Sequence, residues 1–409
     1  MPFCGSLGLP TKNSPQKGFP VNKFSSIFGQ ILQVFDKRDF LQAVRDTRSE
    51  HAAKGFTCWD QFVAMLFCQL GQAQSLREIC GGLATCLGKL KHLGIDDAPK
   101  RSTLSYANEH RPWQLYQMMF YRLLEKCQTM ARFQKRKFRF KNKLFSLDAS
   151  VIELCLSLFD WASFRQTKGA VKLHLLLDHD GYLPTFATVT EGDVHEVNVA
   201  WELKLHKGSI LAVDMGYTDY ALFAKWILEG IFFVTRQKAN AAYRVVEEHK
   251  VPQNRNILKD QIIEFTGYYA KKDCPHRLRR IEVWDQEFNR TLVLLTNHLK
   301  FGATTVAAIY KDRWQIEIFF KAIKQNLKIK TFVGTSKNAL LIQIWTALTV
   351  ILLLKYLKFR SSMNWSLSNL VAMLRYNLFT YRDLWLWLDN PFEVPALIPG
   401  DEQLMLAFR

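Results

Sequence analysis

The sequence predicts an α/β protein in which an all-helical N-terminal part precedes a mixed sheet flanked by helices. Residues 25–132 carry apolar side chains at helical spacing, whereas short apolar or alternating runs predict strands further along the chain. The predicted strands are 144–147, 170–178, 182–190 and 210–213, with a hairpin turn at Asp180 and Gly181. An amphipathic helix over 309–324 follows a long intervening segment.

Four longer helices and one short helix are expected in the N-terminal part. The longer helices are 27–44, 59–70, 76–90 and 113–130. The short helix, 102–111, opens with Ser and Thr after a pair of bases that includes Arg101. A helix of this kind can enter the major groove of DNA, with Arg101 and Arg111 as candidate contacts. An ordinary helical bundle with a basic surface is the alternative for the same segment.

Residues 132–143 contain seven bases and no acid, interleaved with phenylalanines. This composition fits a linker that clamps a phosphate backbone and is anchored in the fold by its aromatic rings. The candidate contacts are Arg136, Lys137 and Arg139, and the candidate anchors are Phe138 and Phe140. An edge strand kept soluble by lysines is the alternative, because 137–141 alternates base and aromatic as a strand does.

An aspartate directly follows each of two predicted strands. Asp148 follows the apolar run 144–147, and Asp214 follows 210–213 and precedes a glycine turn. A carboxylate at the end of a buried strand is costly to bury unless it is paired or holds a cation. A cap or turn role is the alternative for either aspartate taken alone.

The helix 309–324 carries a polar, mixed-charge ridge. Its members, in the spacing Y-x2-R-x3-E-x6-K, are Tyr310, Arg313, Glu317 and Lys324. At about 100° per residue they share an arc of about 60°, beside an apolar stripe that faces the core. A surface i,i+4 ion pair of Arg313 and Glu317 is the alternative.

Three carboxylates without histidine or cysteine partners suit a hard cation such as Mg²⁺ or Mn²⁺. Two such ions, about 4 Å apart, can activate a water or a 3′-hydroxyl and stabilise the leaving oxygen of a phosphodiester. The three candidates are Asp148, Asp214 and Glu317. Arg313 and Lys324 would then meet the phosphates of the substrate strand.

Residues 143–357 resemble the DDE insertion-sequence transposases, specifically the bacterial branch that carries the Y-x2-R-x3-E-x6-K signature. All four signature positions match, as do the contexts Leu-Asp-Ala-Ser and Val-Asp-Met-Gly-Tyr of the two aspartates. The resemblance implies a ribonuclease-H-like mixed sheet, with Asp148, Asp214 and Glu317 binding two Mg²⁺ or Mn²⁺ ions. It implies nicking at the ends of a mobile element followed by strand transfer, with Tyr310, Arg313 and Lys324 on the terminal phosphates.

The resemblance also implies a role for a β-rich insertion over about 235–300. Strands are predicted at 257–265, 279–284 and 291–296. In the family context Arg236 and Lys238 would contact DNA, and Trp284 is a candidate for stacking on a flipped base during hairpin formation. A buried strand tryptophan is the alternative for Trp284.

The predicted organisation has four parts. They are a helical DNA-binding domain (1–131), a basic linker (132–143), the catalytic domain (144–364) and a C-terminal segment rich in aromatics (365–409). The net charge of +18 over 409 residues implies a polyanionic partner. The family implies double-stranded DNA, both terminal inverted repeats and target, and a homodimer paired through the C-terminal region. A terminal helix packed on the catalytic domain is the alternative for that region.

Other sequence features bear on whether the chain spans a membrane and on the state of its cysteines. The apolar run 339–354 is shorter than the about 20 residues of a membrane span and is interrupted by polar residues, so a core helix is predicted. The eight cysteines form no C-x-x-C pair and indicate reduced thiols of a cytosolic protein. His174 is expected to have a structural role, and residues 193–196 are expected to begin a helix.

A metal nuclease or a domesticated DNA-binding relative is the alternative to a transposase. A basic membrane-surface or nucleoid-binding protein without chemistry would leave the three acids unexplained.

Overall fold

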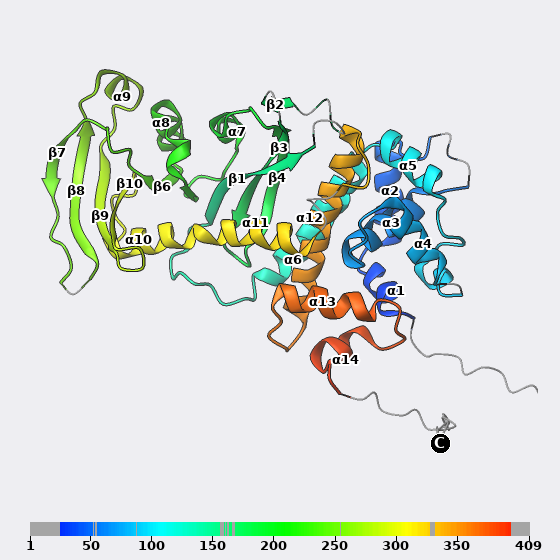
Figure 1. Ribbon diagram of the computed structural model, residues 1–409. Coiled ribbons are helices and arrows are strands. Elements are labelled where there is room, and N and C mark those ends of the chain that lie inside the picture. The colour runs from blue at the N-terminus through cyan, green and yellow to red at the C-terminus, as the bar shows by residue number, and fades with distance from the viewer. Residues whose placement is uncertain are drawn as a thin grey trace, which may run out of the picture.

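The computed structural model describes residues 25–393, except for 52, 54, 87, 156–158, 160, 162, 166–167, 254 and 328–331. Figure 1 shows a broad sheet at one end, a group of N-terminal helices at the other, and the long helix α12 (Lys337–Arg360) between them. Residues 1–24 of the predicted DNA-binding domain and residues 394–409 of the predicted C-terminal segment lie outside the described part.

The N-terminal part is helical, as predicted. Its elements are α1 (Ile27–Leu32), α2 (Lys37–Thr47), α3 (Cys58–Leu70), α4 (Leu76–Ala84), η1 (Leu90–Leu93), α5 (Arg101–His110) and α6 (Gln114–Ala131). The prediction of one helix over 27–44 was wrong, because the side chain of Asp36 caps a new helix by accepting from the Arg38 and Asp39 amides. The helix expected over 76–90 ends early, at Ala84. Helix α5 begins at Arg101 without the expected side-chain cap.

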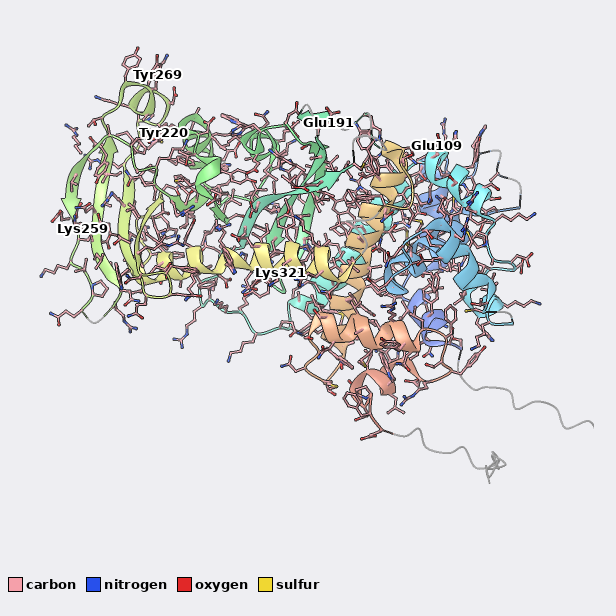
Figure 2. The ribbon with its side chains drawn as sticks, in the orientation of Figure 1. Glu109, Glu191, Tyr220, Lys259, Tyr269 and Lys321 are labelled. Carbon is pink, nitrogen blue, oxygen red and sulfur yellow. The ribbon has the colours of Figure 1, made fainter. Side chains whose placement is uncertain are left out.

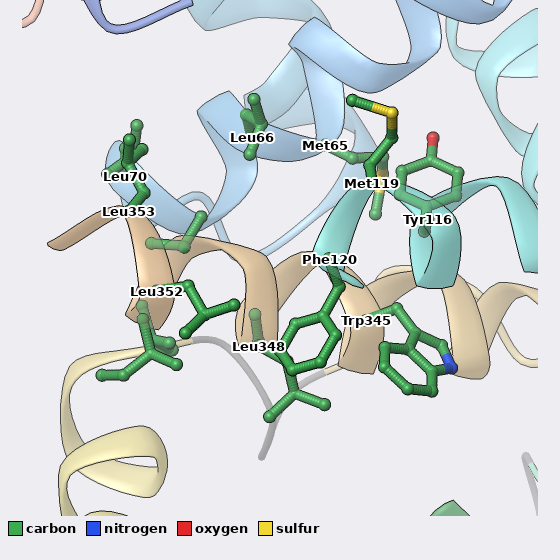
Figure 3. Packing of buried hydrophobic residues seen from close by; sticks show 14 of the residues in the cluster. Met65, Leu66, Leu70, Tyr116, Met119, Phe120, Trp345, Leu348, Leu352 and Leu353 are labelled. Atoms are coloured by element: carbon green, nitrogen blue, oxygen red, sulfur yellow. The ribbon is translucent and has the colours of Figure 1, made fainter. Parts of the chain in front are cut away.

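Helix α12 forms the centre of the largest hydrophobic core. It packs against α3 and α6, and Figure 3 shows Trp345, Leu348 and Leu352 of α12 facing Phe120 of α6. The helix is long and apolar enough to cross a membrane by composition, but 83% of its most apolar window is buried inside the protein. The prediction of a core helix is therefore confirmed. The same core continues into the sheet through Leu173 and Leu175, so N-terminal helices and sheet share one apolar interior.

The strands form one ten-stranded mixed sheet in the order β2-β3-β1-β5-β6-β10-β9-β8-β7, with β4 also pairing with β3. Its strands are β1 (Leu144–Leu154), β2 (Ser163–Arg165), β3 (Lys168–Asp178), β4 (Leu183–Glu191), β5 (Ile210–Val213), β6 (Phe232–Arg236), β7 (Tyr243–Glu248), β8 (Ile257–Phe265), β9 (Leu278–Asp285) and β10 (Arg290–Thr296). Strands β3 and β4 form the predicted hairpin, and Gly181 supplies its left-handed turn residue (φ +79°).

The central strands have the predicted ribonuclease-H-like arrangement. Strand β1 pairs antiparallel with β3 and parallel with β5, and β6 continues the parallel set beside β5. The predicted β-rich insertion is also present, and it extends the same sheet because β10 pairs antiparallel with β6. The alternation expected to make a strand over 137–141 does not do so: that segment forms bends, because the Phe138 and Phe140 rings stack on each other and on Phe301.

Helices cover both faces of the sheet, and alternate residues of β5 point to the helices on opposite faces. Leu211 and Val213 face the layer of α7 (Glu196–Glu202) and α8 (Tyr220–Leu228). Ile210 and Ala212 face α10 (Ala303–Asp312). Helix α10 continues in line into α11 (Trp314–Asn326), which runs past β1 towards α12 (Figure 1). Figure 2 shows Lys321 on the outer side of α11, and Tyr269 of α9 (Tyr268–Asp273) at the far end of the sheet.

The C-terminal helices return to the N-terminal part. They are α13 (Leu367–Asn377) and α14 (Leu384–Asp389). The Ile27 and Phe28 amides of α1 donate to the carbonyls of Thr380 and Leu378, at 3.0 and 2.8 Å. This segment is therefore packed on its own chain, and the seven cysteines in the described part are free thiols, as predicted.

Candidate active site

Asp148 and Asp214 lie side by side because their strands are parallel neighbours. Leu147 of β1 pairs with Val213 of β5, so the next residue of each strand is the aspartate. Asp148 does not end its strand as expected; β1 continues to Leu154 while still paired with β3. Asp214 does end β5 and opens the short 3₁₀ helix η2 (Met215–Tyr217).

The ridge residues lie on two helices rather than one. Helix α10 ends at Asp312 and α11 begins at Trp314, with Arg313 at the junction. The Arg313 amide donates to the carbonyls of both Ile309 and Tyr310, which tightens the turn and interrupts the α-helical pattern there. Because Arg313 keeps helical backbone angles, the two helices stay in line and the ridge is preserved.

Arg313 joins two of the predicted acids. Its Nη2 lies 2.7 Å from Oε1 of Glu317, and its Nη1 lies 3.6 Å from Oδ2 of Asp148. The arginine side chain is only 9% exposed, so the pairing takes place largely out of water. Its charge also lowers the pKa of Asp214, although the ion-pair partner of that carboxylate is Arg236.

Asp214 has a second cation beside it. Arg236 Nη2, at the end of β6, lies 3.2 Å from Oδ1 of Asp214. Burial alone would raise the pKa of Asp214, but the Met215 amide and the two arginines outweigh it, so the pKa lies below its ordinary value. Asp214 is therefore ionised at neutral pH.

Asp148 has the opposite shift. Burial raises its pKa to about 6, against the amide of Ala149 and the charge of Arg313. The neighbouring carboxylates of Glu196 and Glu317 raise it further. A carboxylate crowded by other acids in this way is the kind of group that a bound cation would stabilise.

The remaining ridge residues differ in exposure. Tyr310 is buried in the core, with the Arg313 guanidinium 5.6 Å from its ring centroid. Lys324 Nζ donates to the Val151 carbonyl of β1 at 2.9 Å, which holds α11 against the strand that carries Asp148. Trp314, the first residue of α11, is 54% exposed, as expected for an aromatic side chain that lies off the core-facing stripe.

The three acids offer only carboxylate oxygens to a divalent cation. Across the described residues, no three His, Cys, Asp or Glu side chains lie close enough to hold a metal ion as they stand. The Arg313 guanidinium instead lies where a positive charge is needed between Asp148 and Glu317. The acids supply only carboxylate oxygens, the ligands that Mg²⁺ and Mn²⁺ prefer. The oxygen-only donor set is of the kind that a hard divalent cation prefers, but the described arrangement does not bring three of these acids together around one ion.

The predicted linker contacts are already engaged within the chain. Arg136 Nη2 lies 2.8 Å from Asp180, and Lys137 Nζ lies 2.5 Å from the buried carboxylate of Asp312. Arg139 is exposed, and the Phe138 and Phe140 rings anchor the linker as predicted.

The other predicted DNA contacts are spread over the molecule. Arg101 and Lys238 are exposed, and Trp284, on β9, is half-buried. The prediction that His174 is a structural residue is confirmed. His174 is buried, its Nε2 lies 2.9 Å from the Thr190 hydroxyl, and burial lowers its pKa to about 4.

A buried hydrogen-bond chain near the site was also missed. Ser146 Oγ contacts His179 Nε2 at 2.7 Å, and His179 Nδ1 contacts Asp312 Oδ2 at 2.6 Å. Ser146 and Asp312 are 0% and 1% exposed, so this chain is closed to a substrate. It joins β1, two residues before Asp148, to the residue before Arg313. Nothing local in the sequence indicates it, because its members lie far apart along the chain.

A ribonuclease-H-like sheet with carboxylates on β1, after β5 and on a crossing helix is typical of enzymes that cleave phosphodiester bonds with divalent cations. Residues 139–353 match the family described as the transposase DDE domain, which is more than half of the chain. Residues 23–96 match a domain family of unknown function. The chain belongs to the DDE transposase family, and it is a DNA transposase, an enzyme that cleaves DNA and transfers strands. Enzymes of this family use divalent metal ions.

Relatives agree with this assignment. A transposase from Sinorhizobium fredii is 29% identical over 68% of this chain and 77% of its own length. An insertion-sequence transposase from Geobacillus stearothermophilus is 26% identical over 63% of this chain and 67% of its own. Among solved structures, the synaptic complex of piggyBac transposase with hairpin DNA is similar at a TM-score of 0.41 and 10% identity, covering 91% of this chain and 81% of that one.

Proposed function

We propose that the chain is the transposase of an insertion sequence and that Asp148, Asp214 and Glu317 are its catalytic, metal-binding acids. The observation that carries the proposal is the arrangement around Arg313, which bonds Glu317 at 2.7 Å, approaches Asp148 at 3.6 Å and lowers the pKa of Asp214. Asp148 and Glu317 share one guanidinium, and Asp214 follows the strand that pairs with the strand of Asp148, so the three acids are arranged to accept positive charge.

Two Mg²⁺ or Mn²⁺ ions bound there would activate the attacking hydroxyl and stabilise the leaving oxygen of the phosphodiester. The residues around the acids would bind and orient the DNA strand. The Nε atoms of Arg313 and Arg236 are buried and have no hydrogen-bond partner in the part of the chain described. These two atoms are closed to a DNA phosphate, whereas the Arg236 side chain as a whole is 31% exposed and its outer guanidinium nitrogens would bind a phosphate oxygen beside the acids. Lys324 and Tyr310 complete the signature along the same ridge.

DNA binding outside the site is proposed to be electrostatic. The chain carries a net charge of +18, and Arg101, Arg139 and Lys238 are exposed. A groove of about 680 Å³ beside the linker is lined by bases that include Arg132, Arg136 and Lys204. Because Arg136 and Lys137 are paired with acids, they would serve DNA only by leaving or sharing those partners.

Later steps are proposed from the family. The 3′-hydroxyl ends would be joined to target DNA, through cut-and-paste excision with hairpin ends and with Trp284 stacking on a flipped base. Two copies of the chain would pair two inverted repeats in the synaptic complex. The exposed aromatic residues of the C-terminal segment, Tyr376 and Phe392, would be available to such a pairing.

The test is cleavage of a duplex taken from the DNA flanking the gene, in Mg²⁺ or Mn²⁺, by the wild type and by Glu317→Gln. Metal-dependent nicking at the repeat end, lost in Glu317→Gln while DNA binding persists, is expected. The control is Glu287→Gln, a 65% exposed acid paired at 3.8 Å with Lys311 of α10, which should cleave normally. Equal cleavage by wild type and Glu317→Gln would refute the assignment, and cleavage that ignores the end sequence would indicate a general nuclease.

A further inference from the structure

The junction of α10 and α11 is tied to the rest of the fold by Asp312, the residue before Arg313. Asp312 ends α10, and its completely buried carboxylate contacts His179 Nδ1 at 2.6 Å and Lys137 Nζ at 2.5 Å. His179 directly follows β3, and its Nε2 lies 2.7 Å from Ser146 Oγ of β1. Asp312 therefore connects the junction to two other parts of the fold, the central sheet and the basic linker.

The attachments of the junction to the sheet lie close to Asp148. Ser146 and Asp148 are alternate residues of β1, so their side chains leave the same face of the strand about 7 Å apart. Ser146 reaches Asp312 through His179. Asp148 lies 3.6 Å from Arg313, the next residue of the junction. Two consecutive residues of the junction are therefore held by two positions of one strand, which restricts how far the junction can move over the sheet.

The charge of the buried Asp312 carboxylate is balanced from the linker. Among the described residues its ion-pair partners are the ammonium of Lys137 and the imidazole of His179, which is charged only when protonated. The Lys137 side chain is 56% exposed and that of Asp312 is 0% exposed, so the lysine reaches from the surface to a site that water does not enter. Without Lys137 the carboxylate would face only His179 and the Tyr182 hydroxyl. A buried carboxylate without a cation is costly unless the structure around it opens, and the structure around this one is the junction.

We propose that Lys137 is a positioning residue of the transposase: through Asp312 it holds the junction of α10 and α11 on the sheet beside Asp148. The inference rests on the proposed function of Asp148 and Glu317 as catalytic acids. Arg313, at the junction, lies 3.6 Å from Asp148 and 2.7 Å from Glu317, so a shift of the junction would change the separation of the two acids. A displacement of about 1 Å at an active site can cost about a hundredfold in rate.

The experiment measures single-turnover cleavage of a duplex from the DNA flanking the gene, in Mg²⁺, at increasing concentrations of the full chain. The matched control is Lys135→Gln, which removes an exposed base of the same linker and keeps the ion pair of Asp312. Lys135→Gln and Lys137→Gln should both raise the protein concentration at half-maximal rate, because each removes a positive charge near the DNA. Only Lys137→Gln should also lower the saturated rate, by about tenfold or more.

Two further variants separate positioning from contact with DNA. Lys137→Arg keeps a cation at Asp312 and should restore most of the saturated rate. Ser146→Ala removes the hydroxyl at the other end of the chain, where Ser146 is 0% exposed and closed to DNA. It should lower the saturated rate and leave the concentration at half-maximal rate unchanged. Thermal midpoints of all variants, measured without DNA, report on the stability of the fold.

The outcomes separate this inference from the proposed function. Equal saturated rates for Lys137→Gln and Lys135→Gln, with Glu317→Gln inactive, would overturn the positioning role and leave the catalytic acids in place. A purely structural role would lower the thermal midpoint of Lys137→Gln and leave the saturated rate of the folded protein unchanged. A loss of rate in Lys137→Gln that Ser146→Ala does not share would indicate phosphate contact by Lys137 and also overturn the inference. If Glu317→Gln cleaves as fast as the wild type, both proposals are wrong.

Discussion

Asp312→Asn tests how the catalytic ridge is held on the sheet. The Asp312 side chain is completely buried and contacts Lys137 Nζ at 2.5 Å and His179 Nδ1 at 2.6 Å. The Tyr182 hydroxyl approaches the same carboxylate at 3.3 Å. Burial alone would raise the pKa of Asp312, but the bonds from His179 and Lys137 lower it below the ordinary value, so the group is ionised at neutral pH.

The magnitude follows from these contacts. Breaking a buried ion pair by removing one partner costs about 3–5 kcal/mol, and a buried hydrogen bond to a charge contributes about 1.5–3 kcal/mol. Lys137 is 56% exposed, so water compensates much of its loss, whereas His179 is 5% exposed and keeps no charged acceptor. We expect Asp312→Asn to lower the free energy of unfolding by about 2–4 kcal/mol.

The assay is urea unfolding at neutral pH, compared with the surface control Glu287→Gln, which should change stability by less than about 0.5 kcal/mol. A carboxylate with a lowered pKa stabilises the fold above its unfolded pKa and loses that contribution as pH falls through its folded pKa. The difference between wild type and Asp312→Asn should therefore shrink below about pH 3.9. A loss under about 1 kcal/mol at neutral pH, or one that persists in acid, would refute the reasoning.

Two further predictions concern buried or bonded bases. Burial lowers the pKa of Lys355 to about 8, with Lys358 adding to the effect, so Lys355→Met should stabilise the protein at pH 7 by up to about 3 kcal/mol. Because a lysine with a lowered pKa destabilises the fold most below that pKa, the gain measured in urea should fade between pH 8 and about 10.5; a constant gain would contradict it. Arg111→Ala should lose about 1–2 kcal/mol, since Arg111 donates to the Thr57 and Phe56 carbonyls. Arg101→Ala, which removes an exposed base, should instead weaken DNA binding in a gel shift at unchanged stability, and the opposite pattern would remove α5 from DNA binding.

Short-range patterns were enough to predict much of this protein. Alternation and a glycine turn predicted the β3–β4 hairpin, and an apolar run predicted β5 and the aspartate after it. The apolar run 339–354, which is interrupted by polar residues, predicted a buried helix, and α12 is such a helix. The spacing of the ridge residues predicted one polar face, because helical periodicity depends only on neighbours along the chain.

Only the tertiary structure decided which groups meet. No local pattern shows that Arg313 lies between Asp148 and Glu317, or that the half-exposed Lys137 pairs with the buried Asp312, 175 residues away. The sequence likewise marked Glu196 only as the start of a helix; the packing of α7 on η2 brings it beside Asp214. Local patterns determine elements because backbone and side-chain periodicity act over a few residues. Charge pairing and burial depend on separation in space, so they are determined only when the elements pack.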